Sequence, residues 1–245
     1  MKKFIIFLFL LNLISCKKAE NRSCFKGVGN IISSEILLTN FDKIFMGPHL
    51  KYVLVQDTIN KVVLTGGENL LNFIETNVDA SLLSINNNNK CNFLRSYSKI
   101  VTVEIHYINV INIEFEGTEK VESRNQMQTN YLTLALSTGA GEFNLNINAL
   151  SLNIVASKGW SNYKLKGQVN YLKIVARSNS FGESYGLAVM DSIHVISNSS
   201  ENIKINAYNC FLRSETNKGG DIWYQGYPTS IIHNSYGEGV LLNKN

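Results

Sequence analysis

Six polar or acidic residues recur about every twenty positions in the second half of the chain, each after a short turn of small residues. Carboxylate and amide oxygens are ligands that Ca²⁺ accepts in proteins. If the turns stack in register, neighbouring side chains lie about 5 Å apart, where bare carboxylates repel one another. The pattern therefore predicts either a column that holds a cation such as Ca²⁺, or side chains that point into solvent or accept backbone N–H groups of their own turns. The six residues are Glu142, Asn162, Glu183, Glu201, Asp221 and Glu238.

Aromatic residues in the same region could stack on sugar rings, because exposed flat rings next to asparagine can form a platform for a glycan. Two alternatives remain open: a ladder of stacked rings in the core, or a cover over the C-terminal end of the fold. The candidates for glycan stacking are Trp160, Tyr163, Trp223 and Tyr224, within a set that also contains Tyr185, Tyr227 and Tyr236.

The sequence contains neither the H-E-x-x-H motif of zinc proteases nor a phosphate-binding P-loop. A zinc site is not predicted, because the cysteines form no C-x-x-C pair and the histidines are scattered. We therefore expect a protein that is not an enzyme and has no cofactor apart from the Ca²⁺ considered above. The alternative is a protein that binds or cleaves polysaccharides, with paired carboxylates on one face. The four histidines are His49, His106, His194 and His233.

The elements that must position these side chains form a repeat from residue 131 onward. Each unit consists of a strand, a small-residue turn and a second strand, and the first apolar residues of successive units are 20, 20, 21, 19 and 19 positions apart. Such units bury their apolar edges only when they stack at the spacing of paired strands, about 4.8 Å. Leucine-rich repeats need a fixed frame of Leu and Asn that this chain lacks, so the pattern predicts a parallel β-helix, or β-solenoid, with coils of roughly 20 residues. The anchor residues are Leu132, Leu152, Leu172, Ile193, Leu212 and Ile231.

The turns of this repeat are rich in glycine and serine. A coil of about twenty residues must bend several times, and its corners need residues that tolerate a positive φ or pack without bulk. The six corners read "STGAG", "SKGWS", "SNSFG", "SNSS", "NKGG" and "SYGEG".

The region before residue 131 is also rich in β-branched and aromatic residues, in short runs at 51–56, 61–65, 81–86, 99–107 and 110–115. Residues 67–74 could form a helical turn. The expected fold is all-β, with an irregular β-rich N-terminal part that precedes the solenoid.

The first sixteen residues are typical of a bacterial lipoprotein signal. Lys2 and Lys3 precede an apolar run at 4–11, and Leu-Ile-Ser comes directly before Cys16. This run is shorter than a membrane-spanning helix, so an ordinary secretory signal is the alternative. The pattern predicts a signal peptide at 1–15, lipidation of Cys16, a tether at 16–23 and a single domain at 24–245. The membrane is then a partner through the lipid anchor, and we expect a location in the cell envelope, at the outer membrane, on a face that the sequence does not specify.

The charge and the cysteine content of the chain limit which partners and which disulfides can be expected. The chain has 23 basic and 19 acidic residues, and removal of Lys2 and Lys3 leaves 21 against 19, a net charge of +2. Without a basic stripe, no nucleic-acid partner is predicted. After Cys16 three cysteines remain, which allow three pairings. We expect a disulfide between Cys24 and Cys91, which would close a long loop outside the regular coils, and a buried apolar Cys210.

Several stretches together resemble one known family. The segment "GGENLLNFIETNVDASLLSI", the stretch "KCNFLRSY" and the closing "DIWYQGYPTSI" and "GEGVL" are similar to the head GIN domain family, a group of autotransporter-adhesin-like bacterial lipoproteins. The resemblance spans residues 24–242 and implies a β-helix-like, all-β domain in an envelope lipoprotein. We expect this domain to have an adhesin-like binding role or a structural role, with a surface or glycan ligand. The corners "SNSSEN" and "SNSFGE" lack the family's paired glycines.

Overall fold

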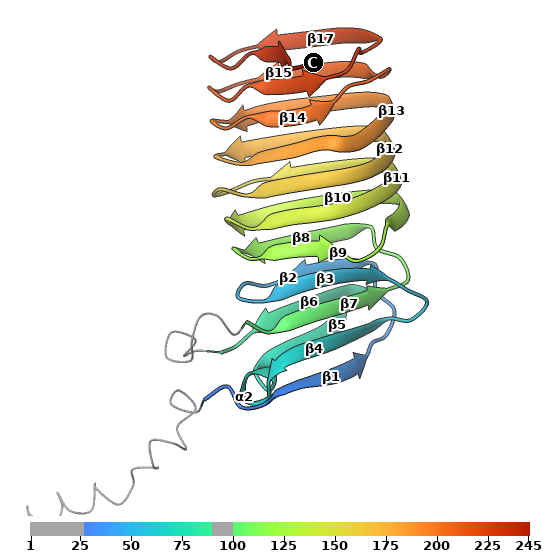
Figure 1. Ribbon diagram of the computed structural model, residues 1–245, viewed down its shortest axis with the longest axis vertical. Coiled ribbons are helices and arrows are strands. Elements are labelled where there is room, and N and C mark those ends of the chain that lie inside the picture. Colours follow the sequence, from blue (N-terminus) through green and yellow to red (C-terminus); the bar gives the residue numbers. More distant parts are fainter. Residues whose placement is uncertain (1–26, 90–99) are drawn as a thin grey trace, which may run out of the picture.

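The computed structural model describes residues 27–89 and 100–245, and its strands stack into one tall column (Figure 1). All eighteen strands belong to one sheet that winds around a central core, and most neighbouring strands are parallel. The predicted all-β solenoid is therefore confirmed. The helix in the described part is the single turn α2 (Glu68–Leu71), at the position where the sequence indicated a helical turn. Within the described ranges, no helix has both the length and the apolar character that a membrane span requires.

The upper part of the column consists of coils that follow one another in chain order. Their long strands curve around one edge, so that the first half of a strand completes one coil and the second half begins the next (Figure 1). Leu132 pairs with Leu152, Leu152 with Leu172, and the same register continues through Ile193, Leu212 and Ile231, which confirms the predicted stacking. The strands are β10 (Met127–Gly139), β11 (Glu142–Ala156), β12 (Asn162–Ser178), β13 (Phe181–Ser199), β14 (Ile203–Asn206), β15 (Phe211–Thr216), β16 (Ile222–Gln225), β17 (Ser230–Ser235) and β18 (Leu241–Asn243).

The N-terminal part is irregular because its stacking order differs from its chain order. Strands β2 and β3 form a layer that lies between the later layers β6–β7 and β8–β9, with parallel pairing on both sides. Below these, β4, β5 and β1 run antiparallel to their neighbours and form the foot of the column. The strands are β1 (Ile31–Leu37), β2 (Lys43–Met46), β3 (Lys51–Gln56), β4 (Lys61–Gly67), β5 (Ile74–Asp79), β6 (Leu82–Asn87), β7 (Thr102–Tyr107), β8 (Asn112–Gly117) and β9 (Lys120–Ser123).

The core is apolar at the middle of the column and more polar toward its C-terminal end. The rings of Tyr52, Phe115 and Phe143 are in contact, with centroid distances of 5.9 and 6.1 Å. In one interior column, Leu136 is followed upward by Ala156 and Ala176, and then by the buried hydroxyl residues Ser197 and Thr216; Ser235, which is exposed, ends the column. The last coils therefore carry hydroxyl groups in this column, although they also expose the apolar residues Ile231, Ile232 and Val240.

The small-residue corners stack on one another at the edge opposite the curved strands (Figure 1). Gly139 and Gly159 have φ values of +102° and +77°, a backbone conformation that favours glycine. The Trp160 backbone N–H donates to the Gly139 carbonyl at 3.1 Å, so successive corners are in direct backbone contact. Glycine recurs there because a side chain on one corner would meet the backbone of the corner below.

Candidate functional site

The predicted cation column is wrong, because the strand register does not bring its six residues together. Glu142 lies beside Lys120 on one side and Asn162 on the other, and the Asn162 amide donates to the Glu142 carboxylate at 2.9 Å. The neighbour of Asn162 in the next coil is Phe181, so the column stops there.

Glu183 lies one strand position further along, between two lysines. Its register partners are Lys164 below and Lys204 above, with 3.8 Å between the Lys204 ammonium and the carboxylate. Opposite charges therefore alternate on this face, and lysines provide the neutralisation that carboxylates at this spacing require.

The remaining acidic candidates lie in turns. The Asp221 carboxylate accepts the Val240 backbone N–H at 3.0 Å and the Trp223 indole N–H at 3.3 Å. Asp221 therefore binds N–H groups, but the backbone donor belongs to the next coil and not to its own turn, as the alternative expected. Asp221 lies beside Asn202 rather than Glu201, and Glu238 is exposed. Among residues 27–89 and 100–245, no group of three or more His, Cys, Asp or Glu side chains could hold a metal ion.

The four aromatic candidates do not form one platform. Tyr163 is fully buried in the core, so its assignment to glycan stacking is wrong. The Trp223 ring lies between the ammonium groups of Lys204 and Lys244, at 5.7 and 4.5 Å, and Tyr224 packs against the core. Trp160 alone is well exposed, at the corner between β11 and β12.

The sequence was expected to lack the G-x-S-x-G pattern of serine hydrolases, and this expectation is wrong, because residues 182–186 read G-E-S-Y-G. In those enzymes the serine occupies a sharp turn between a strand and a helix. Here Ser184 lies inside strand β13, is completely buried, and donates to the Lys204 carbonyl at 3.0 Å. The match therefore does not represent a nucleophile.

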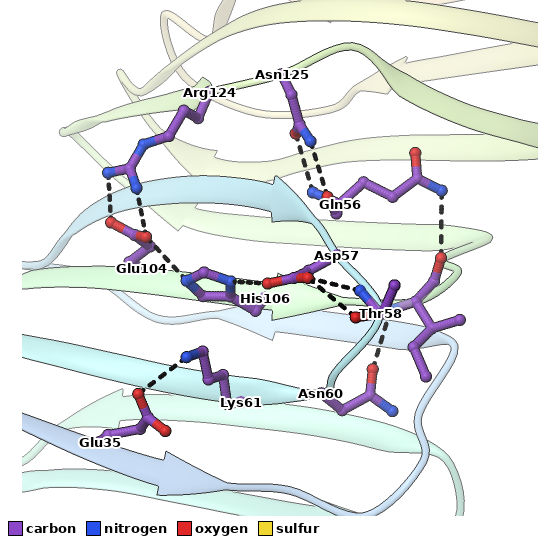
Figure 2. A network of polar contacts seen from close by, with 11 residues as sticks. Glu35, Gln56, Asp57, Thr58, Asn60, Lys61, Glu104, His106, Arg124 and Asn125 are labelled. Atoms are coloured by element: carbon purple, nitrogen blue, oxygen red, sulfur yellow. Dashed lines mark hydrogen bonds and ion pairs between the residues drawn. The ribbon is translucent and has the colours of Figure 1, made fainter.

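A polar network links the strands of the foot to the coils above (Figure 2). Both ring nitrogens of His106 contact carboxylates, Nδ1 at 2.7 Å from Asp57 and Nε2 at 2.8 Å from Glu104. Arg124 forms a two-pronged pair with the same Glu104, and Lys61 on β4 binds Glu35 on β1 at 2.9 Å. Both ring nitrogens can donate together only when the imidazole carries two protons. The role that we assign to this network is structural: its contacts hold β1, β4, β7, β3 and β9 together.

We expect the free energy of unfolding to decrease at acid pH, because this network holds the carboxylate of Asp57. Hydrogen bonds from the His106 side chain and, next in size, the Thr58 backbone lower the pKa of Asp57. The ionised carboxylate thus stabilises the fold above its unfolded pKa of about 3.9, and the stabilisation is lost as pH falls through the folded pKa. His106→Gln should weaken this acid dependence, measured as urea unfolding midpoints over a pH series.

The matched control for this experiment is His49→Gln, because His49 is largely exposed and does not contact Asp57. The control should keep the acid dependence of the unaltered protein. Parallel pH profiles for His106→Gln and the unaltered protein would show that the network does not act through Asp57.

A groove of about 820 Å³ lies at the curved edge of β10, β11 and β12. Gln128, Asn148 and Gln168 pair in register on three successive coils, and Asn109, Asn130 and Asn170 line the adjacent bend. We call this hollow the amide groove, defined by these six residues. Its signal in the sequence is amide residues 20 positions apart at 128, 148 and 168, within the repeat but away from the glycine-rich corners.

The cysteine predictions fall mostly outside the described residues. Cys16, Cys24 and Cys91 lie in the segments 1–26 and 90–99, so lipidation and the disulfide remain predictions. Cys210 is buried as expected, and burial raises the pKa of its thiol to about 11. A thiol in that state is protonated at neutral pH and behaves as a small apolar group.

The sequence profile of the family described as "Putative auto-transporter adhesin, head GIN domain" matches residues 40–228, more than half of the 245-residue chain. The chain belongs to the head GIN domain family. The resemblance noted from the sequence is thereby confirmed. No curated protein matched the sequence.

Solved structures share the fold of this head GIN domain at low sequence identity. A "putative adhesin" from Bacteroides fragilis NCTC 9343 superposes with a TM-score of 0.79 at 20% identity, over 88% of this chain and 97% of that one. A "putative adhesin" from Parabacteroides merdae ATCC 43184 gives 0.63 at 15% identity, over 89% and 98%. A "putative lipid binding protein" from Parabacteroides distasonis ATCC 8503 gives 0.64 at 16% identity, over 89% and 98%. These similarities establish the shared solenoid fold.

Proposed function

We propose that this head GIN domain protein is a lipid-anchored protein of the bacterial cell envelope, and that its solenoid is a rigid, adhesin-like binding surface. The observation that carries the proposal is the match to an adhesin family over residues 40–228. A solenoid suits this role, because stacked coils expose long continuous faces on a stiff scaffold. Its ligand would be a surface component or a glycan.

The arrangement of the two ends supports an anchor at Cys16. The first described residues lead into β1 at the foot, and β17 and β18 lie at the opposite end of the column (Figure 1). A lipid on Cys16 would hold the foot near the membrane through a polar tether, with the C-terminal coils directed away from it. Two or three acyl chains anchor a protein durably.

Polysaccharide cleavage receives less support than binding. A cleaving site needs a carboxylate pair close to the sugar. The residues that line the amide groove include no carboxylate. The hollow that contains Glu142 and Glu183 is lined otherwise by lysines, Asn144, Leu165 and Gly186, without an aromatic ring. We therefore propose binding without catalysis.

The anchor is tested by Cys16→Ser in cells that produce the full chain. We expect the variant to leave the membrane fraction or to accumulate as an unprocessed precursor, because the modified thiol is lost. Immunoblots of membrane and soluble fractions measure this, and Cys210→Ser is the matched control that should stay with the membrane. Normal processing and membrane recovery of Cys16→Ser would contradict the lipid anchor.

A further inference from the structure

We propose that the amide groove binds an uncharged polysaccharide, whose chain lies along the axis of the solenoid. This inference rests on the proposed binding function and specifies its ligand class and its site. The groove is at the curved edge of the long strands, whereas the glycine-rich corners occupy the opposite edge (Figure 1).

The amides of the groove have unused hydrogen-bonding capacity. Within the described residues, the side chains of Asn109, Gln128, Asn130, Asn148, Gln168 and Asn170 make no hydrogen bond to protein. Each amide offers two N–H donors and one carbonyl acceptor. Sugar hydroxyls both donate and accept, so a ladder of free amides complements them without a charge.

The start of the ladder is held in place by a neighbouring strand. The Gln56 side chain donates to the Gln128 carbonyl at 2.8 Å and accepts the Gln128 backbone N–H at 2.6 Å. The backbone at this end is therefore fixed while the Gln128 side chain remains exposed. Binding groups on a fixed backbone lose less conformational entropy when the ligand arrives.

The lining of the groove favours a neutral ligand. Its residues are amides, Thr129, Tyr131 and the apolar Ile111, Ala149 and Leu150, without a charged side chain. The face with Glu142 and Glu183, in contrast, has alternating lysines and glutamates. An acidic polysaccharide would find no cation in the groove to pair with its carboxylates or sulfates.

Two exposed tyrosines stand beside the amides. Tyr131 and Tyr171 are 65% and 49% exposed, and Ser151 occupies the coil between them in the same register. The neighbouring Asp191 side chain raises the pKa of Tyr171, so the phenol keeps its proton at neutral pH. Tyrosine provides a flat ring with an apolar face and a polar tip, which suits a sugar ring that is apolar on its faces and polar at its rim.

The spacing of the coils suits a sugar chain. Paired strands lie about 4.8 Å apart, which is comparable to the length of one pyranose unit in an extended chain. Successive amides can then meet successive sugars, and the two tyrosines can contact every second ring.

A second hollow higher on the same edge is less suited to the ligand. Most of its amides are already used by the protein: for example, Asn206 donates to the Tyr185 carbonyl at 3.2 Å, and Asn245 accepts the Gly226 backbone N–H at 2.6 Å. Its tyrosines, Tyr208 and Tyr227, contact each other edge to face. The amide groove is therefore the better candidate for the polysaccharide-binding site.

The proposal is tested by affinity electrophoresis of the full chain, purified in mild detergent, through gels that contain laminarin, glucomannan, arabinoxylan or galactomannan, with polygalacturonate as the acidic comparison. We expect retardation by at least one neutral polysaccharide and none by polygalacturonate. Tyr131→Ala and Asn148→Ala should each weaken the interaction at least about tenfold, as expected for residues that line a binding site.

The matched controls are Tyr236→Ala and Asn198→Ala, which alter a similar residue outside the groove and should bind normally. Unchanged unfolding midpoints confirm that all four variants are folded. The inference is overturned by no retardation in any neutral gel, by stronger retardation in polygalacturonate, or by equal loss in groove and control variants. If cells still adhere through this protein after such a result, the proposed function is kept. Only the assignment of the amide groove as a polysaccharide-binding site is then refuted.

Discussion

Replacing Phe143 with alanine should lower the free energy of unfolding by about 3–5 kcal/mol. Phe143 is completely buried in β11, its ring contacts Phe115, and Tyr163 occupies the same position one coil above. Removal of the ring leaves a cavity that neighbouring coils cannot close, because hydrogen bonds between coils fix their separation. Chemical unfolding followed by circular dichroism measures the loss.

Phe211→Ala is the control for this substitution. Phe211 lies on β15 with its side chain only partly buried, so the same atoms are removed from a more solvated position. We expect a clearly smaller loss than for Phe143→Ala. Equal losses would contradict the placement of the core.

Replacing Gly159 with alanine should cost about 2–4 kcal/mol, since strain at a positive φ and overpacking each contribute about 1–3 kcal/mol. The φ of Gly159 is +77°, and an added Cβ would overlap the carbonyl of Gly139 in the corner below. The strain cannot be relieved locally, because that carbonyl accepts the Trp160 backbone N–H. The unfolding midpoint of the variant measures the effect.

Gly219→Ala is the matched control, because a Cβ at Gly219 would have open space around it. This variant should be close to neutral or slightly stabilised, through the smaller conformational freedom of its unfolded chain. If both variants lost equal stability, the close stacking of the corners would be wrong.

The sequence predicted the coil register correctly because apolar residues at a period near twenty leave one way to bury them all. Leu132 through Ile231 pair as expected on five successive strand pairs. The sequence did not predict where the side chains near the corners lie, because the corners differ in length. The turn before β12 covers residues 157–161, whereas the turn before β13 covers 179–180, so Asn162 pairs with Phe181 and the acidic residues separate.

The burial of Tyr163 could have been predicted from strand periodicity. It alternates with polar Asn162 and Lys164 and shares the interior face with Leu165, as the two-residue period of a strand requires. The order of the lower layers could not be predicted, since the chain places β2 and β3 between strands that it forms later. No local pattern specifies such a long-range insertion.

The sequence alone did not indicate the amide groove, although its residues recur within the repeat. Gln128, Asn148 and Gln168 follow the same period, but polar residues in a strand ordinarily indicate only the solvent side. Only the strand register, the curvature of the strands and the nearby tyrosines together indicate that these residues line a groove.

The proposed function requires the lipid-anchored solenoid to hold the cell to a surface. The most direct measurement is the adhesion of cells to mucin-coated and polysaccharide-coated surfaces, compared between cells with the unaltered chain, cells that lack it and cells that produce Cys16→Ser. We expect adhesion to fall to the same low level in the last two, because a released protein cannot hold a cell. Undiminished adhesion of cells that lack the chain would show that the solenoid is not an adhesive surface.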